Sequence, residues 1–361
     1  MKIALAHDFL TQLGGAERVL KELHEIFPDA PVYTLFFDEK KTYGKFAGWD
    51  IRASFLQKLP KFFSYKWYLP LLPTAVSYLD LTGFDVVISD ASALIKGIKV
   101  SPGAKHICYC HTPTRYLWQE RNDYVKNLTY PKLVKIVVQP CLSLLKKWDW
   151  SVAQKVDVFI ANSQEVRGRI EKYYQRDSEV IYPPIDTDFF TPASQDSSRS
   201  YFLAAGRLEP YKKIDLVIKA FTRLKILLKV AGTGSLSKKL RESAGPNIEF
   251  LGRVGDEELR ELYRGAKAFV FPALEDAGMM ILEATACGTP VIAYKAGGAL
   301  EFVEEGITGE FFTEQNANSL INVIEKFDPA KYRTEALVAK ARQFDKKVFR
   351  EKIQQVIAKL K

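Results

Sequence analysis

Short apolar segments alternate with longer amphipathic segments along almost the whole of this 361-residue chain. Such alternation predicts strands joined by helices, the pattern of a doubly wound parallel sheet. In the first half the predicted strands are residues 2–7, 32–36, 85–89, 106–110, 156–161 and 179–182. After a break, a second series of strands is predicted at residues 201–205, 227–231, 248–252, 268–271 and 291–294. The sequence therefore predicts an α/β chain with two Rossmann-like, doubly wound parallel-sheet domains.

The break between the two series falls at two adjacent prolines, Pro183 and Pro184. Prolines interrupt regular structure, and a chain of this length exceeds what one hydrophobic core usually organises. We predict a first domain over residues 1–183 and a second over residues 184–344. Residues 345–361 are predicted to form a helix of alternating charge that could pack on either domain.

Composition narrows the expected environment. A net charge of +9 indicates an anionic partner, such as a phosphorylated substrate or an acidic membrane surface. Nucleic acid is disfavoured as a partner because no recognised nucleic-acid motif accompanies the charge. Four cysteines fit a reducing compartment, and no apolar stretch approaches the ~20 residues that cross a bilayer. We therefore expect a cytoplasmic protein without an export signal.

Residues 58–78 combine lysines with aromatic side chains, in the order Lys-Leu-Pro-Lys-Phe-Phe-Ser-Tyr-Lys-Trp-Tyr followed by Leu-Pro-Leu-Leu-Pro. That mixture suits a peripheral contact with an anionic membrane, on the inner face of the cell membrane for a cytoplasmic protein. It equally suits a basic surface loop whose aromatic rings pack on the first domain. Both interpretations stand at this point.

A pair of glycines, Gly14 and Gly15, comes shortly after the first predicted strand, which ends at His7 and Asp8. Glycines at the start of a helix let the backbone approach a phosphate closely. The spacing is not G-x-G-x-x-G, which argues against ordinary dinucleotide binding. The pair is therefore either a phosphate contact or a simple turn.

The first strand of the second series is followed by Gly206, Arg207 and Lys212. Arginine offers a planar fork for phosphate oxygens and lysine a mobile point charge. Open α/β sheets bind ligands at the carboxyl ends of their strands, which is where these cations are expected. Taken alone, the segment could equally be a solvated basic loop.

Two carboxylates eight positions apart, Glu275 and Glu283, lie between the last two predicted strands. We predict that Gly278 opens a helix, so that Glu275 lies in the preceding loop. Free amides at the helix start would face an anion or sugar hydroxyls, and Glu283 could accept hydrogen bonds from two ribose hydroxyls. Without other support, the two residues could instead be an N-terminal helix acid and part of a solvated helix face.

In this order the segments resemble the retaining glycosyltransferases of family 4, whose two-domain architecture is called GT-B. The resemblance covers nearly the whole chain and rests on Gly14-Gly15-Ala-Glu, Gly206-Arg207-Leu-x3-Lys212 and Glu275-x7-Glu283 with Ala-Cys-Gly-Thr-Pro. A further segment, His106-Ile-Cys-Tyr-Cys-His111-Thr-Pro-Thr-Arg115-Tyr-Leu-Trp118, looks like the mannosyltransferases that build bacterial surface polysaccharide. The resemblance implies two domains that face a central cleft, with the acceptor on the first and the donor on the second. It also implies that the last helix returns to the first domain.

The resemblance implies a role for each matching residue. Arg207 and Lys212 would bind the donor diphosphate and stabilise charge on the leaving nucleotide, with no metal ion or other cofactor. Glu275 would contact the donor sugar and Glu283 the ribose. The remaining implied contacts are the amides around Gly278 and Met279 with sugar hydroxyls or phosphate, Gly14 and Gly15 with the donor phosphates, and His111 with the sugar. The acceptor-side candidates are Asp8 and Arg115.

The implied reaction is transfer of a hexosyl group, with mannose from GDP-mannose as the expected donor, to a saccharide or polyprenyl-linked saccharide. One residue departs from the family pattern: Ala277 stands where an aromatic residue is usual, so we expect a changed sugar pocket. Two alternatives remain open. One is another GT-B enzyme, such as a UDP-sugar transferase or an epimerase, and the other is a non-catalytic scaffold that binds membranes or polyanions.

Two further patterns resemble metal sites. Asp186-Thr-Asp188 follows the two prolines, and we interpret it as a turn. Cys108 and Cys110 lie two positions apart on a predicted strand, without a second ligand pair at zinc spacing. We therefore expect buried strand cysteines at these positions.

Overall fold

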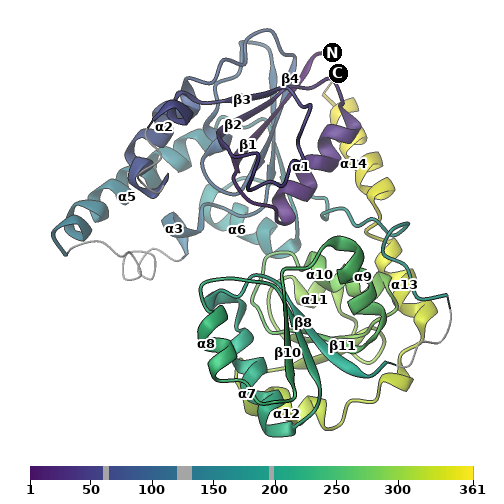
Figure 1. Cartoon of the computed structure of the whole chain (residues 1–361). Helices are drawn as coiled ribbons and strands as arrows, with labels where there is room; N and C mark the ends of the chain where they lie inside the picture. The colour runs from purple at the N-terminus through teal and green to yellow at the C-terminus, as the bar shows by residue number, and fades with distance from the viewer. Residues whose placement is uncertain (60–64, 120–131, 195–198, 361) are drawn as a thin grey trace. The chain divides into compact units, whose positions relative to one another are not determined.

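The computed structural model describes residues 1–59, 65–119, 132–194 and 199–360. The chain forms two compact units, one of Met1–Tyr182 with Arg350–Lys361 and one of Pro183–Phe349 (Figure 1). Each unit is built on one sheet, and every pairing between the named strands is parallel. Two Rossmann-like α/β domains, as predicted from the sequence, are therefore confirmed.

The first unit has a seven-stranded sheet in the order β3-β2-β1-β4-β5-β6-β7. Its strands are β1 (Ile3–Leu10), β2 (Val32–Phe37), β3 (Ile51–Ala53), β4 (Val86–Ala91), β5 (Lys105–Cys110), β6 (Val158–Ala161) and β7 (Glu179–Val180). Every residue of β4 is buried, because helices cover both faces of a parallel sheet. This burial explains the continuous apolar runs in the sequence.

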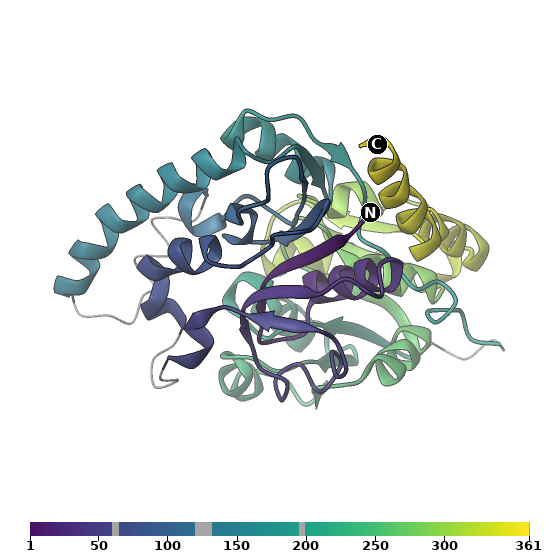
Figure 2. The same cartoon turned by 90° about the horizontal axis from the view of Figure 1, so that it is seen from above.

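Helices cover both flanks of the first sheet. The α-helices are α1 (Gly15–Ile26), α2 (Leu72–Ser77), α3 (Arg115–Trp118), α5 (Lys132–Ala153), α6 (Gln164–Tyr174) and α14 (Lys346–Ala358). The 3-10 helices are η1 (Phe55–Lys58), η2 (Tyr65–Leu71) and η3 (Ile95–Gly97). Arg350 of α14 forms ion pairs with Glu22 and Glu25 of α1, and the two helices lie side by side in both views (Figures 1 and 2). The same views place α2 and α5 together on the other side of the unit.

The second unit has a six-stranded sheet in the order β10-β9-β8-β11-β12-β13. Its strands are β8 (Tyr201–Ala205), β9 (Leu228–Ala231), β10 (Ile248–Gly252), β11 (Ala266–Phe271), β12 (Val291–Tyr294) and β13 (Gly309–Phe312). Its helices are α7 (Ile214–Leu224), α8 (Ser237–Glu242), α9 (Asp256–Arg264), α10 (Met279–Ala286), α11 (Ala299–Phe302), α12 (Ala317–Ile324), α13 (Thr334–Arg342), η4 (Pro210–Lys212) and η5 (Pro329–Lys331). The apolar side of α7 packs on this sheet through Val217, Ile218 and Phe221, which are fully buried.

The sequence missed two strands, β3 and β13, which lie at the edges of their sheets. Both are short, and β3 is mostly exposed, so neither leaves an apolar run long enough to recognise. A second error concerns β1, which continues through His7 and Asp8 to Leu10 instead of ending at them. Polar side chains can lie inside this buried strand because each of them has buried partners.

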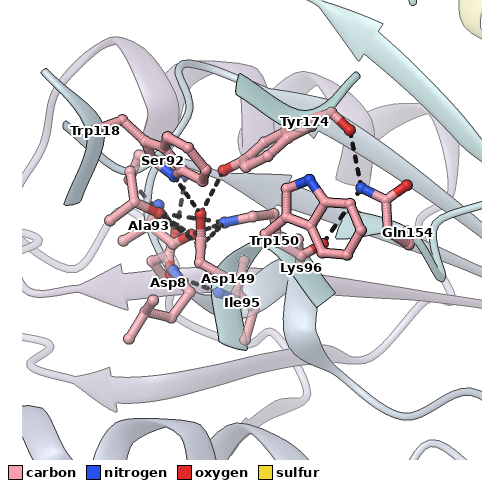
Figure 3. Close-up of polar contacts among 12 residues, drawn as sticks. Asp8, Ser92, Ala93, Ile95, Lys96, Trp118, Asp149, Trp150, Gln154 and Tyr174 are labelled. Atoms are coloured by element: carbon pink, nitrogen blue, oxygen red, sulfur yellow. Dashed lines mark hydrogen bonds and ion pairs between the residues drawn. The ribbon is translucent and has the colours of Figure 1, made fainter. Parts of the chain in front are cut away.

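A buried ion pair joins η3 to α5 in the first unit. Lys96 Nζ donates to Asp149 Oδ1, and the side chains are 1% and 0% exposed. Burial disfavours the charged form of Lys96, but Asp149 outweighs this effect and raises the pKa of Lys96. The second oxygen, Oδ2 of Asp149, accepts from Trp118 Nε1 and from the Tyr174 hydroxyl, each at 2.8 Å (Figure 3). One carboxylate therefore joins η3, α3, α5 and α6.

Replacing Asp149 with alanine should lower the free energy of unfolding by about 3–5 kcal/mol. The change leaves the Lys96 ammonium buried without its counterion and removes an acceptor from Trp118 and Tyr174. Urea denaturation followed by circular dichroism measures the loss.

The matched control is Glu179→Gln, which removes an exposed ion pair with Lys359 in the same unit. Its cost should stay below about 1 kcal/mol. Equal losses in Asp149→Ala and Glu179→Gln would contradict the role assigned to the buried pair.

Candidate functional site

The central strands of the second sheet, β8 and β11, are neighbours and run in parallel. The chain continues from β8 to β9 on one side of this pair and from β11 to β12 on the other. Such a switch in strand order is where open α/β sheets bind ligands, at the carboxyl ends of the strands. Arg207 and Lys212 follow β8, and Glu275 and Gly278 follow β11. The parallel order therefore brings both predicted segments to one edge of the sheet.

The turn after β8 touches the turn after β9. Gly206 has a φ of 136° and Gly232 a φ of 132°, which residues with a side chain rarely adopt. A Cβ on Gly232 would lie 1.9 Å from the carbonyl oxygen of Gly206. The chain then turns through η4, and the ammonium of Lys212 comes within 4.0 Å of where a Cβ on Gly206 would be. Lys212 thus lies back over the end of β8.

Lys212 forms an ion pair with Glu275 at this edge, between Nζ and Oε1. The two side chains are 15% and 19% exposed, so salt screens the pair less than it screens a surface pair. The ring centroid of Tyr211 is 5.7 Å from Cζ of Arg207 and 5.6 Å from Nζ of Lys212. Two cations, one aromatic ring and one carboxylate therefore form a compact group.

The loop that carries Glu275 is fixed by the turn after β12. The amide of Gly298 donates to the carbonyl oxygen of Glu275 at 2.8 Å, and a Cβ on Gly297 would lie 2.5 Å from that oxygen. Gly278 is the N-cap of α10, which begins at Met279, so the predicted helix start is confirmed. The first amides of a helix have no acceptor within it, so those of Met279 and its neighbour can bond a ligand.

Side-chain contact places the start of α10 beside the turn after β8. The sulfur of Met280 lies 3.8 Å from the position of a Cβ on Gly206. One turn further along α10, Glu283 is 2% exposed and accepts from the Tyr263 hydroxyl at 3.1 Å. The alternative that Glu283 belongs to a solvated helix face is therefore wrong. Its contact with ribose stays a prediction.

The first sheet has its own switch in strand order, between β1 and β4. His7 of β1 and His111, which follows β5, both bond the carboxylate of Asp90 on β4. Nδ1 of His7 lies 2.8 Å from one oxygen, and Nε2 of His111 lies 2.5 Å from the other. His7 Nε2 also forms an ion pair with Glu17 of α1, at 3.7 Å. Four ionisable side chains thus form one chain of contacts.

Burial and the neighbouring charges shift the pKa values of His7 and Asp90 in opposite directions. Burial disfavours the charged form of His7, but hydrogen bonds and ion pairs with Asp90 and Glu17 outweigh it and raise the pKa of His7 to about 10. Burial would raise the pKa of Asp90, but His111 and His7 lower it. On the same sheet His106 behaves oppositely: its ring bonds the Ser89 hydroxyl at 2.8 Å, and burial lowers its pKa to about 4. His7 is therefore charged at neutral pH and His106 is not.

Asp8, an acceptor-side candidate from the sequence, is buried and bonded to backbone amides. The side chain is 1% exposed, and its Oδ2 accepts from the amides of Ser92 and Ala93 at 2.8 and 2.7 Å. Its Oδ1 accepts from the amides of Leu94 and Ile95, both at 2.8 Å (Figure 3). Asp8 therefore holds the turn after β4, and a contact with the acceptor stays a prediction.

The other candidates of the first unit lie at helix starts. Gly14 is the N-cap of α1 and Gly15 its first residue, and a Cβ on Gly14 would lie 3.1 Å from Oε2 of Glu17. Arg115 is the first residue of α3, four positions after His111. Their contacts with donor and acceptor remain predictions.

His7, Glu17 and Asp90 were not among the functional residues predicted from the sequence. Each carries a charge or a titratable ring within or beside a segment that is otherwise apolar or helical. A carboxylate directly after the buried run Val86–Ser89 is a usable signal, because an ionised group in a buried strand needs a partner. His7 is that partner, 83 positions away in the sequence.

The two sequence patterns that resemble metal sites, at Asp186–Asp188 and at Cys108 and Cys110, have other roles in the structure. The amide of Phe189 donates to Asp186 Oδ1 at 3.0 Å, which confirms the turn, and Lys346 pairs with Asp186 at 2.6 Å. Cys108 and Cys110 are buried free thiols, as expected. In the described part of the chain, no three or more His, Cys, Asp or Glu side chains come together as metal ligands.

Of the basic aromatic segment 58–78, residues 60–64 lie outside the described residues. Leu69 and Leu72 are buried in the hydrophobic core of the first unit, whereas Leu71 is 45% and Tyr78 76% exposed. Part of the segment therefore packs on the first unit and part faces outward. No helix among the described residues is both long and apolar enough to cross a membrane.

Two family models match the chain. One, Glycosyltransferase Family 4, matches residues 13–189, and the other, Glycosyl transferases group 1, matches residues 186–344. Between them the two models span most of the sequence. The chain therefore belongs to the family 4 type of glycosyltransferases and has the two-domain GT-B fold.

Individual proteins with similar sequences or folds agree with this class. A D-inositol 3-phosphate glycosyltransferase of Mycolicibacterium smegmatis is 29% identical over 182 residues, which is 44% of this chain and 42% of that protein. The match thus spans less than half of that relative's length. The structure of Anabaena Alr3699/HepE in complex with UDP and glucose superposes with a TM-score of 0.75 at 22% identity over 99% of both chains. Sucrose-phosphate synthase from Thermosynechococcus elongatus gives 0.76 at 17% identity, covering 100% of this chain and 99% of that one.

Protonated His7 should stabilise the first unit in a pH-dependent way. Its folded pKa of about 10 exceeds the ordinary 6.5, so the folded protein holds a proton that the unfolded chain releases. That stabilisation is fully present below pH 6.5 and is lost as the pH rises towards 10. Relative to His7→Gln, the wild type should lose a few kcal/mol of unfolding free energy between these limits, measured by urea denaturation.

The control is His106→Gln, because His106 is neutral above pH 6.5 in both the folded and unfolded states. Its difference from the wild type should not change over the same range. A difference between the wild type and His7→Gln that is independent of pH would show that His7 is uncharged.

Proposed function

We propose that this protein transfers a hexosyl group from a nucleotide sugar to an acceptor hydroxyl. The observation that carries the proposal is the ion pair of Lys212 and Glu275 where β8 and β11 end, with Arg207 beside the same tyrosine ring. Cations at that edge suit a diphosphate, and a carboxylate suits sugar hydroxyls. The group therefore offers a partner to both parts of a nucleotide sugar.

Arg207 and Lys212 would bind the diphosphate, Arg207 through its planar fork and Lys212 as a point charge. Negative charge grows on the diphosphate as the bond to the sugar breaks. The cations then stabilise the transition state more than the bound donor, which is how they would raise the rate. In this proposal the chain's own cations supply the positive charge, and no metal ion or other cofactor is required.

The transfer would retain the configuration at the anomeric carbon. The carbon–oxygen bond to the diphosphate breaks while the bond to the acceptor oxygen forms on the same face, and the acceptor's proton passes to the leaving phosphate oxygen. A double-displacement reaction would need a carboxylate free to attack the anomeric carbon. Glu275 is engaged by Lys212 and Glu283 is buried against Tyr263, so we assign Glu275 to the sugar hydroxyls instead.

For the donor we propose GDP-mannose, on the resemblance of the segment from His106 to Trp118 to bacterial mannosyltransferases. UDP-glucose is the second candidate, because the structurally similar Anabaena protein is in complex with UDP and glucose. Ala277 leaves more room than the usual aromatic residue, and it lies beside the fixed turn at Gly298. The size of the donor sugar should therefore depend on position 277.

For the acceptor we propose a saccharide or polyprenyl-linked saccharide of surface polysaccharide synthesis. The protein would reach a lipid-linked acceptor from the cytoplasmic face, through peripheral contact of the segment 58–78 with an anionic membrane. The exposed side chains of Lys58, Leu71 and Tyr78 support that contact, since they combine charge with apolar surface.

Lys212→Ala should slow sugar transfer about 100- to 1,000-fold, because it removes one of two cations from the leaving diphosphate. Purified protein is incubated with radiolabelled GDP-mannose or UDP-glucose and a saccharide acceptor, and the product is separated and identified. The wild type should transfer mannose from GDP-mannose with retention.

The matched control is Lys219→Ala on α7, which removes an exposed ion pair with Asp215. Its rate should stay within about twofold of the wild type. Near-normal transfer by Lys212→Ala would refute the assignment of Lys212, and transfer from UDP-glucose alone would replace GDP-mannose as the donor.

Glu275→Gln should separate donor binding from transfer. Without the carboxylate, Lys212 is no longer neutralised, so GDP should bind about fivefold more tightly. Transfer should nevertheless slow at least about tenfold, because the sugar hydroxyls lose a charged acceptor. Calorimetric titration with GDP measures the affinity, and the transfer assay measures the rate.

Glu305→Gln is the control for the change of charge, since Glu305 forms an exposed ion pair with Lys295 in the same unit. Glu305→Gln should leave the affinity for GDP and the rate of sugar transfer unchanged. Weaker binding of GDP by Glu275→Gln would show that the carboxylate does not compete for Lys212.

A further inference from the structure

The chain of contacts from Glu17 through His7 and Asp90 to His111 has an interior and one partly open end. Glu17, His7 and Asp90 are 3%, 2% and 0% exposed, whereas the side chain of His111 is 13% exposed. The four residues come from α1, β1, β4 and the end of β5. Three buried groups on three separate elements thus lead to the partly exposed imidazole of His111.

The positions of two protons follow from the acceptor. An ionised carboxylate can only accept hydrogen bonds, so each imidazole nitrogen that bonds Asp90 must carry a hydrogen. Nδ1 of His7 and Nε2 of His111 are those nitrogens. The ring of His111 therefore has Nε2 committed to Asp90, and its other nitrogen, Nδ1, is the one that can meet a ligand.

We propose that Asp90 is a positioning residue for His111: it fixes the ring with Nε2–H towards the strand and leaves Nδ1 to contact the substrate. The inference rests on the proposed function, with His111 in the substrate-contacting role that the family resemblance implies. It adds a residue that no motif contains, and it specifies which nitrogen of His111 faces the ligand.

His7 and Glu17 make this arrangement stable. An isolated Asp90 carboxylate would be costly to bury, and the charged ring of His7 balances it on the side away from His111. Glu17 in turn balances His7. The remaining oxygen of Glu17, Oε2, has no hydrogen-bond partner in the described part of the chain, and it lies beside Gly14 at the start of α1. The support for His111 therefore extends to the glycine loop.

A second buried imidazole on these strands, that of His106, bonds a hydroxyl group instead of a carboxylate. Ser89, one residue before Asp90, bonds the ring of His106 at 2.8 Å, also between β4 and β5. That pair contains no carboxylate, and both residues are buried in the sheet. Ser89→Ala is therefore a matched control: it removes a buried bond to an imidazole between the same two strands without touching His111.

The direct test is the position of the proton on His111 in the whole, ligand-free protein. The chain has only four histidines, so ¹⁵N-labelled imidazole signals are few, and His111→Ala identifies those of His111 by their disappearance. We expect Nε2 of His111 to carry a proton at neutral pH. An unprotonated Nε2 would overturn the proposal. This readout needs no turnover, so it stands even if the transfer reaction itself is not found.

Kinetics supply the second test. Asp90→Asn should lower kcat for sugar transfer at least about tenfold, since a misplaced catalytic contact costs this much or more, while Ser89→Ala stays within about twofold. In the His111→Ala background, Asp90→Asn should cause no further loss beyond about twofold, because both changes remove the same contact. Independent, multiplicative losses would overturn the proposal. Should Asp90→Asn fail to fold, the proton position in the wild type decides alone.

Discussion

Parallel strand pairing is the constraint on which the candidate site depends. In a parallel sheet all carboxyl ends meet at one edge, so residues far apart in the sequence become neighbours whenever their strands are adjacent. Adjacent β8 and β11 bring Lys212 to Glu275 across 63 positions, and adjacent β1 and β4 bring His7 to Asp90 across 83. The same strand order in both units thus produces a paired set of charges at each sheet's carboxyl edge.

Those charges are balanced before any ligand arrives. Lys212 is paired with Glu275, His7 stands between two carboxylates, and the carboxylate of Asp8 accepts from four backbone amides. Burying an ion is costly unless its partners are fixed, so the loops that carry these groups are held in place by the groups themselves. Because the loops are held in place, only the side-chain pair of Lys212 and Glu275 has to open when a charged donor binds, and the backbone around it stays fixed.

Local signals in the sequence predicted the fold and the two segments that meet where β8 and β11 end. The strand at Tyr201–Ala205 and the helix start at Gly278 were predicted with the bounds observed, because an apolar run and a capping glycine are both local features. The structural role of Asp8 was not predicted because its four amide partners lie more than 80 positions away. Edge strands such as β13 were missed because the ladder that defines them comes from a neighbouring strand. Features that depend on distant partners required the structure.

We propose that Lys212 and Glu275 form the donor site of a glycosyltransferase. A crystal structure of the protein with bound GDP would show whether they do. We expect phosphate oxygens within hydrogen-bond distance of Lys212 Nζ and of the Arg207 guanidinium, at the carboxyl ends of β8 and β11. A diphosphate bound elsewhere on the chain, with the ion pair of Lys212 and Glu275 intact, would contradict it.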